Sequence, residues 1–158
     1  MALGAPPSLA AAARDGGAPR GVTCSKESSM HQAYLIGISD YPGHSLASVP
    51  NDLALMRRAL IHQEFDPSSI VTFGDEHGTL TALQAVLATI QADFADADSG
   101  HCFVYFSGSG MLSVDPLRGG VKPIDGDDLD FCTALPFAAL NDYLPVRPGV
   151  QVTVVLDC

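Results

Sequence analysis

Three short segments of the 158-residue chain place small, acidic or thiol-bearing residues directly after apolar runs. These segments are Ser39-Asp40, Ser107 to Gly110, and Asp157-Cys158. An apolar strand that breaks into small residues lets its last side chains and backbone N–H groups face a cleft. Taken singly, each segment has a simpler interpretation as a turn. A phosphate-binding loop is only weakly indicated, because no GxxxxGK[ST] or GxGxxG motif follows any apolar run.

The apolar runs that precede these segments predict buried strands. Four runs are short and nearly continuous, as in the strands of a parallel sheet, at residues 33–38, 70–73, 102–106 and 150–156. Cys102 lies in the third run and is expected to be a core residue. Between the third and fourth runs we expect a long polar loop, which contains Gly108, Gly110, Gly119 and Gly120.

Helical segments separate the predicted strands. Asn51 is expected to cap one helix, whose apolar face comprises Leu53, Met56, Ala59 and Leu60. Thr79 is expected to cap a second helix, whose apolar stripe comprises Leu83, Val86, Leu87, Ile90 and Phe94. A short third helix is expected over residues 137–144. This alternation implies an α/β fold with right-handed crossovers and a mainly parallel sheet. In such folds the ligand site lies beyond the carboxyl ends of the strands.

Composition limits the classes of partner. Apolar residues make up 47% of the chain, so it is globular, and its formal net charge is −10 at pH 7. Such a surface repels phosphates and anionic lipid, so neither nucleic acid nor a membrane is expected as partner, whereas a basic peptide or a divalent cation matches the charge. Residues 1–31 are expected to be disordered and residues 32–158 to form one domain. A cytoplasmic location is expected, because the chain has no span of about 20 apolar residues and no secretory signal.

Four motifs occur in an order typical of one protein family. They are Ala33 to Tyr41 (AYLIGISDY), Pro50-Asn51-Asp52, Tyr105 to Gly110 (YFSGSG) and Val155 to Cys158 (VLDC). By these motifs residues 32–158 resemble the large-subunit part of caspase-like cysteine peptidases (peptidase C14), most closely metacaspases. The resemblance implies a caspase-like three-layer α/β sandwich with a mainly parallel sheet, truncated here after the fourth core strand. It also implies peptide-bond hydrolysis by a Cys/His dyad, in which the imidazole activates the thiol.

Both members of that dyad depart from the family pattern. Relatives end the third strand in Ser-Gly-His-Gly, and Ser109 stands at the histidine position, where a hydroxyl is no useful base near neutral pH. Gly110 falls where backbone N–H groups stabilise the oxyanion. In relatives the fourth strand ends in an Asp, a variable residue and the nucleophilic Cys. If Asp157 is matched to that Asp, Cys158 falls on the variable position. The nucleophile would then follow Cys158, unless a one-residue slip of the loop makes Cys158 the thiol itself.

None of the histidines is expected to replace the missing base, since all five lie at predicted loop or surface positions: His31, His44, His62, His77 and His101. By resemblance, Asp52, Ser107 and Asp157 occupy the pocket that prefers Arg or Lys in metacaspases, and two carboxylates there could hold a guanidinium. Without the resemblance, Asp52 is a helix-start residue favoured by the helix dipole.

Calcium is the one cofactor that the resemblance suggests, since some metacaspases bind it through nearby acids. A run of acids follows the predicted polar loop and comprises Asp125, Asp127, Asp128 and Asp130. Their spacing matches no calcium loop, so a solvated loop and no cofactor are expected.

The sequence thus predicts a member of the caspase and metacaspase family, by resemblance an Arg/Lys-directed cysteine-type endopeptidase, that is inactive as given. Whether it acts as an enzyme stays open. One alternative is a pseudoprotease that docks a related protease or basic peptides, and another is a fragment or truncated gene model. The expected partners are a small-subunit-like chain, a homologous caspase-like protein or a basic peptide. An unpaired strand edge at residues 150–156 is expected to make the chain self-associate.

Overall fold

A four-stranded parallel sheet forms the centre of the computed structural model, which describes residues 29–114 and 116–158. Its strand order is β4-β1-β5-β9, with bounds β1 Ser29–Gly37, β4 Ile70–Phe73, β5 Ser99–Ser107 and β9 Val150–Asp157. All three strand pairs are parallel. The predicted α/β class with a parallel sheet is therefore confirmed.

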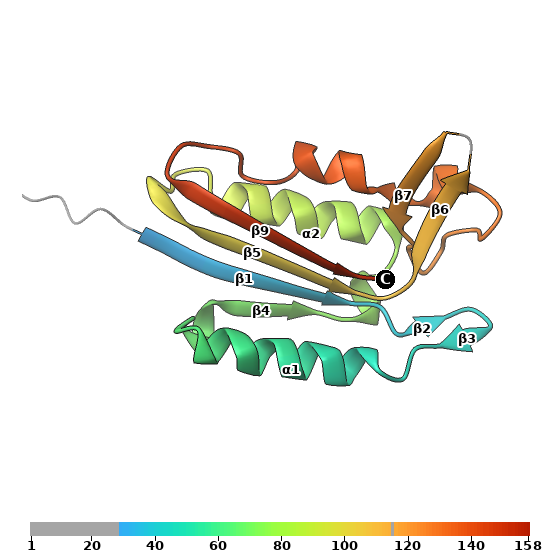
Figure 1. Cartoon of the computed structure of the whole chain (residues 1–158), viewed down its shortest axis with the longest axis horizontal. Coiled ribbons are helices and arrows are strands. Elements are labelled where there is room, and N and C mark those ends of the chain that lie inside the picture. Colours follow the sequence, from blue (N-terminus) through green and yellow to red (C-terminus); the bar gives the residue numbers. More distant parts are fainter. Residues whose placement is uncertain (1–28, 115) are drawn as a thin grey trace, which may run out of the picture.

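Helices cover both faces of the sheet (Figure 1). Helix α1 (Val49–His62) lies on one face, and α2 (Leu80–Asp93) lies on the other together with the 3-10 helix η4 (Phe137–Asp142). The remaining elements are short: β2 (Asp40–Tyr41), β3 (His44–Ser45), η1 (Pro67–Ser69), η2 (Asp75–His77), β6 (Gly110–Val114), β7 (Leu117–Val121), η3 (Phe131–Thr133) and β8 (Leu135–Pro136).

Strand alternation divides the core into two layers, one on each side of the sheet. Successive strand residues point to opposite faces, so Tyr34 and Ile36 pack toward α2, while Ala33 and Leu35 pack toward α1. The predicted stripe of α2 is confirmed, since its five members are all buried: Leu83, Val86, Leu87, Ile90 and Phe94. Cys102 is fully buried among them, and burial raises the pKa of its thiol to about 12, so this cysteine is a core residue as predicted.

The two long helices differ in how well their starts were predicted. Thr79 caps α2 as expected, because its hydroxyl accepts a hydrogen bond from the N–H of Ala82 at 3.3 Å. The prediction that Asn51 caps α1 is wrong, since the helix begins two residues earlier at Val49. Pro50 explains the earlier start, because a proline lacks the N–H that the first turn leaves unpaired and has a helical φ.

The prediction of a long polar loop is also wrong. Residues 110–136 instead contain a small antiparallel sheet of β6, β7 and β8. Its glycines are strand residues at which other chain segments approach closely. A Cβ on Gly120 would lie 2.8 Å from the carbonyl oxygen of Leu135, and one on Gly119 would lie 2.6 Å from the ring of Phe137. A glycine in a sequence can therefore indicate a strand position that another segment approaches closely, and not only a turn.

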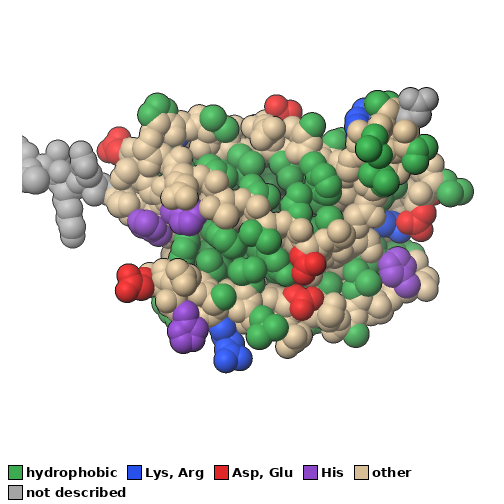
Figure 2. All heavy atoms as spheres, in the orientation of Figure 1, with side chains coloured by type: hydrophobic (Ala, Val, Ile, Leu, Met, Phe, Trp, Pro, Cys, Tyr) green, Lys and Arg blue, Asp and Glu red, His purple; other side chains and the backbone are tan. Residues whose placement is uncertain are grey.

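Strand β9 lies at the edge of the parallel sheet. Within the described residues it pairs with β5 alone, and none of its eight residues is buried. Figure 2 shows apolar surface on both sides of this strand, toward α2 and toward α1. The predicted exposed edge is therefore present in the described part of the chain.

Strand β1 begins at Ser29, three residues before the expected domain boundary. The expected disorder of the N-terminal segment otherwise falls on residues 1–28, which lie outside the described residues. Among the helices that the structure describes, none has both the length and the apolar character needed to cross a bilayer.

Candidate active site

The carboxyl ends of the three long strands lie in one row. Gly37 of β1 is opposite Ser107 of β5, and Ser107 is opposite Asp157 of β9. The loops that leave these strands therefore begin next to one another, as the sequence predicted for the three segments. Ser107 itself is buried, with 2% of its surface exposed, so it lines the floor of this region rather than its surface.

Two carboxylates lie near Tyr105 on the α1 side of the row. Tyr105 donates a hydrogen bond of 3.0 Å to Asp157 Oδ2, and it lines with Asp52 a groove of about 250 Å³. Burial raises the pKa of Tyr105, and the hydrogen bond to Asp157 and the charges of Asp157 and Asp52 raise it further, while Ser107 lowers it. Figure 2 shows two acidic side chains next to each other between β9 and α1. Asp52 thus lines the groove, and Asp157 is hydrogen-bonded to Tyr105, which lines it too.

Close packing of α1 against β1 holds Asp52 at this groove. A Cβ on Gly37 would lie 2.5 Å from Leu53 Cδ1 and 2.8 Å from Val49 Cγ1, which is closer than real side chains approach. The glycine therefore lets the first turn of α1 rest on the end of β1. Asp52 is in that first turn and faces the groove together with the apolar residues of the next turns, Leu55, Met56 and Ala59.

Ser109 lies on the other side of the row and is fixed through its backbone. Its N–H donates to the Tyr41 hydroxyl at 2.9 Å, and that hydroxyl donates to the Lys122 carbonyl at 3.1 Å. The Lys122 N–H donates directly to the Ser109 carbonyl at 2.9 Å. The Tyr41 hydroxyl therefore bridges the Ser109 N–H and the Lys122 carbonyl, in place of a direct backbone hydrogen bond between them. Burial raises the pKa of Tyr41 to about 12, against the lowering effect of its bonds to Ser109, so the hydroxyl stays protonated and keeps both bonds.

His44 is exposed at the surface, as predicted, and its ring contacts two residues near the row. It lies on the β2–β3 hairpin, and its ring stacks on Tyr41 with centroids 5.2 Å apart and an interplanar angle of 6°. Its Nε2 is 3.5 Å from Ser109 Oγ. An imidazole therefore stands beside the position from which the family histidine is missing. No sequence signal places it there, because His44 and Ser109 are 65 residues apart.

Gly110 and Cys158 lie in contact at the exposed side of the row. A Cβ on Gly110 would be 3.3 Å from Cys158 Sγ. Because Ser109 and Lys122 face each other as a hydrogen-bonded pair, Gly110 and Val121 form the next, non-hydrogen-bonded pair, whose N–H groups point away from the partner strand. The Gly110 N–H is thus directed out of the ladder. Burial and the Asp157 charge raise the pKa of Cys158, which disfavours the reactive thiolate.

Asp75 is a further residue of this region that the sequence analysis missed. It follows β4 and accepts three hydrogen bonds from the loop after β1: from Ser39 N at 2.6 Å, Ser39 Oγ at 2.7 Å and Asp40 N at 3.1 Å. Burial would raise the pKa of Asp75, but the bonds from Ser39 and Asp40 outweigh it and the pKa is lowered. Asp75 therefore fixes the start of the loop that carries Tyr41 and His44. The sequence held one indication of this role, since Asp75 follows shortly after a predicted strand.

The acidic loop that could suggest calcium is held together by its own carboxylates. Asp125 accepts from Leu80 N, Asp127 from Leu129 N and Asp130 from Cys132 N, each at 2.9 Å. Asp128 forms an ion pair with the buried ammonium of Lys122. Within residues 29–114 and 116–158, no three His, Cys, Asp or Glu side chains are grouped as metal ligands.

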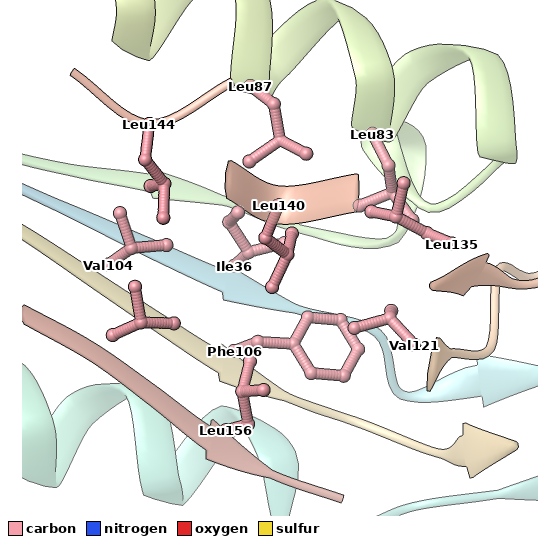
Figure 3. Close-up of a pocket in the computed structure, with 11 residues that line it drawn as sticks. Ile36, Leu83, Leu87, Val104, Phe106, Val121, Leu135, Leu140, Leu144 and Leu156 are labelled. Carbon is pink, nitrogen blue, oxygen red and sulfur yellow. The ribbon is translucent and has the colours of Figure 1, made fainter. Parts of the chain in front are cut away.

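An enclosed cavity of about 20 Å³ lies on the opposite face of the sheet, between α2, η4 and the strands (Figure 3). Its lining is apolar throughout: Ile36, Leu83, Leu87, Val104, Phe106, Val121, Leu135, Leu140, Leu144, Val154 and Leu156. A cavity without polar groups offers no chemistry. The candidate site is therefore the row of strand ends and not this cavity.

Residues 30–157 match the family model of the caspase domain, peptidase C14. The match spans all four strands of the parallel sheet and the whole row of strand ends. No curated protein matches the chain significantly.

Replacing Asp75 with Asn tests whether this carboxylate anchors the loop. Because its pKa is lower in the folded chain than the ordinary value of 3.8, its contribution is complete above that value and is lost as the pH falls through the lowered pKa. Asp75→Asn should therefore lower the free energy of unfolding by about 1–3 kcal/mol at pH 7. The difference should shrink toward zero in strong acid. Urea unfolding as a function of pH measures it, with the exposed Asp96→Asn as control, and a difference independent of pH would contradict the assignment.

Proposed function

The chain belongs to the caspase domain family of cysteine peptidases, and from this premise we propose that it is a metacaspase-type protein that recognises arginine or lysine side chains. The observation that supports this specificity is that Tyr105 shares a groove with Asp52 and donates its hydroxyl hydrogen to Asp157. The groove has a volume of about 250 Å³ and an acid, Asp52, in its lining. Its apolar wall contacts the methylene groups of such a side chain, while the carboxylates accept from its cationic end.

We further propose that this chain does not perform the thiol-dependent hydrolysis of its family. In that reaction an imidazole withdraws the proton of a cysteine thiol, and the thiolate attacks the scissile carbonyl. Ser109 occupies the position of that imidazole by motif. The raised pKa of Cys158 adds to the argument, because neither a strong base nor a stabilising charge favours its thiolate.

A second candidate function is that of a non-catalytic binding module, and the β9 edge favours it. An edge strand presents unpaired N–H and C=O groups that pair readily with another strand. The half-buried Val154 and Leu156 extend this edge into an apolar surface toward α2, and Val155 extends it toward α1. We propose that a strand of a small-subunit-like segment, or of a homologous caspase-like protein, pairs with β9 and covers both surfaces.

Binding of a basic peptide tests the specificity. A peptide with one arginine should bind more tightly than the same peptide with citrulline, which has nearly the same shape and no charge. Asp52→Asn and Asp157→Asn should each weaken binding of the arginine peptide by about 1 kcal/mol, roughly fivefold, because the groove is only partly desolvated. Isothermal titration calorimetry measures the affinities. Asp96→Asn is the matched control, and equal affinity for the two peptides would contradict the proposal.

Peptide cleavage tests the absence of the family reaction. The purified chain should not cleave arginine- or lysine-containing peptides in a thiol-dependent manner, with or without calcium, because position 109 carries a hydroxyl. Fluorogenic peptide substrates, with and without iodoacetamide, provide the measurement. Cleavage that iodoacetamide abolishes, and that is absent from Cys158→Ala, would overturn the proposal and identify Cys158 as the nucleophile.

Sedimentation velocity tests the β9 edge. The isolated chain should self-associate at micromolar concentration, because strand pairing between copies covers the edge. Val155→Lys places a charge on the apolar surface beside the edge and should shift the chain toward monomer. Leu117→Lys removes an equally apolar but more exposed side chain from β7 and should leave association unchanged. A parent chain that is monomeric and unfolds cooperatively would argue against an available edge.

A further inference from the structure

The side chains of Ser109 and His44 form a hydroxyl–imidazole pair at the carboxyl end of the sheet. Nε2 of His44 lies 3.5 Å from Ser109 Oγ. This separation is long for a hydrogen bond, but such contacts between a base and a nucleophile are often loose without substrate and tighten in the complex. No other histidine hydrogen-bonds a residue of the row within the described part of the chain.

Tyr41 orients both members of this pair. Its ring stacks on the imidazole of His44, and its hydroxyl accepts the hydrogen bond from the Ser109 backbone N–H. Tyr41 is itself 2% exposed and is tied to the Lys122 carbonyl, so its position is fixed by the core. A nucleophile and its base generally require such a third group that orients the base.

A carboxylate and a backbone N–H group lie near the pair. Asp128 has a lowered pKa, chiefly because of its hydrogen bond with Lys122 and to a smaller extent because of the charges of Lys122 and His44. The Gly110 N–H, which points out of the β6–β7 ladder, lies directly after Ser109 in the chain and can donate to an oxygen that becomes negative beside it.

We propose that Ser109 is a nucleophile activated by His44, so that the site carries serine-type acyl-transfer chemistry in place of the Cys/His chemistry of its family. Ser109 Oγ attacks a carboxyl ester or amide carbonyl while His44 Nε2 takes the hydroxyl proton. The tetrahedral intermediate collapses as the imidazolium gives that proton to the leaving alcohol or amine, which leaves an acyl ester on Ser109. Water then attacks the ester with His44 again as base, which releases the acid and restores Ser109. The inference does not depend on the proposed preference for basic side chains.

A fluorophosphonate probe tests the pair directly. Ser109 Oγ should form a bond to phosphorus as fluoride leaves, and peptide mass spectrometry identifies the modified residue. General-base assistance is worth about 10²–10⁴ in rate, so Ser109 should react at least about a hundredfold faster than Ser45, an exposed serine on the β2–β3 hairpin. His44→Phe preserves an aromatic ring for stacking on Tyr41 but removes the base, and it should slow the labelling of Ser109 to the rate of Ser45.

Two controls separate this result from other causes. Asp96→Asn, at an exposed position outside the site, should label like the parent chain. Thermal unfolding of His44→Phe should match the parent, which shows that the ring alone maintains the hairpin. Labelling of Ser109 no faster than of Ser45, or labelling that is unchanged in a folded His44→Phe variant, would overturn the proposal.

Discussion

The parallel register of β1, β5 and β9 is the constraint on which the site depends, because it places Gly37, Ser107 and Asp157 in one row. The loops that leave the three strands must begin side by side, whatever their sequences. At the β1 position of the row a glycine lets α1 approach, which brings Asp52 to the groove. At the β9 position Asp157 accepts a hydrogen bond from Tyr105, which lines the groove. The strand between them continues through Gly108 into Ser109 and the β6–β7 hairpin.

Two tyrosine hydroxyls organise the two sides of this row. Tyr105 belongs to the core layer under α1 and binds Asp157, so it gathers negative charge in the groove. Tyr41 belongs to the layer under α2 and binds the backbones of Ser109 and Lys122, so it positions the hydroxyl and the imidazole. The two activities that we propose, recognition of a cationic side chain and reactivity toward a carbonyl, therefore involve separate groups at the carboxyl end of one sheet. Substitutions on one side should leave the other side intact.

Local patterns in the sequence were sufficient for the main elements of the fold and for the order in which the strand ends lie side by side. Apolar runs identified the four parallel strands, and the stripe ending at Phe94 identified α2, because both signals depend on neighbours in the sequence. The sheet of β6, β7 and β8 was missed because its glycines were interpreted as loop residues, although they allow close approach of distant segments. Asp52 and Asp157 were paired through family motifs. The contacts of His44 and Asp75 were not predicted, because each is made with a residue far away in the chain, 65 and 36 positions distant.

The central claim is that the row of strand ends binds a cationic side chain between Asp52 and Asp157. Titration of the ¹⁵N-labelled chain with agmatine, a small alkylguanidine, tests it most directly by amide chemical shifts. The account predicts saturable shifts confined to the residues around the groove, namely Gly37, Asp52, Tyr105, Ser107 and Asp157, and their loss in the Asp52→Asn/Asp157→Asn double variant. Shifts spread over the acidic surface without saturation, or shifts that persist in the double variant, would contradict it.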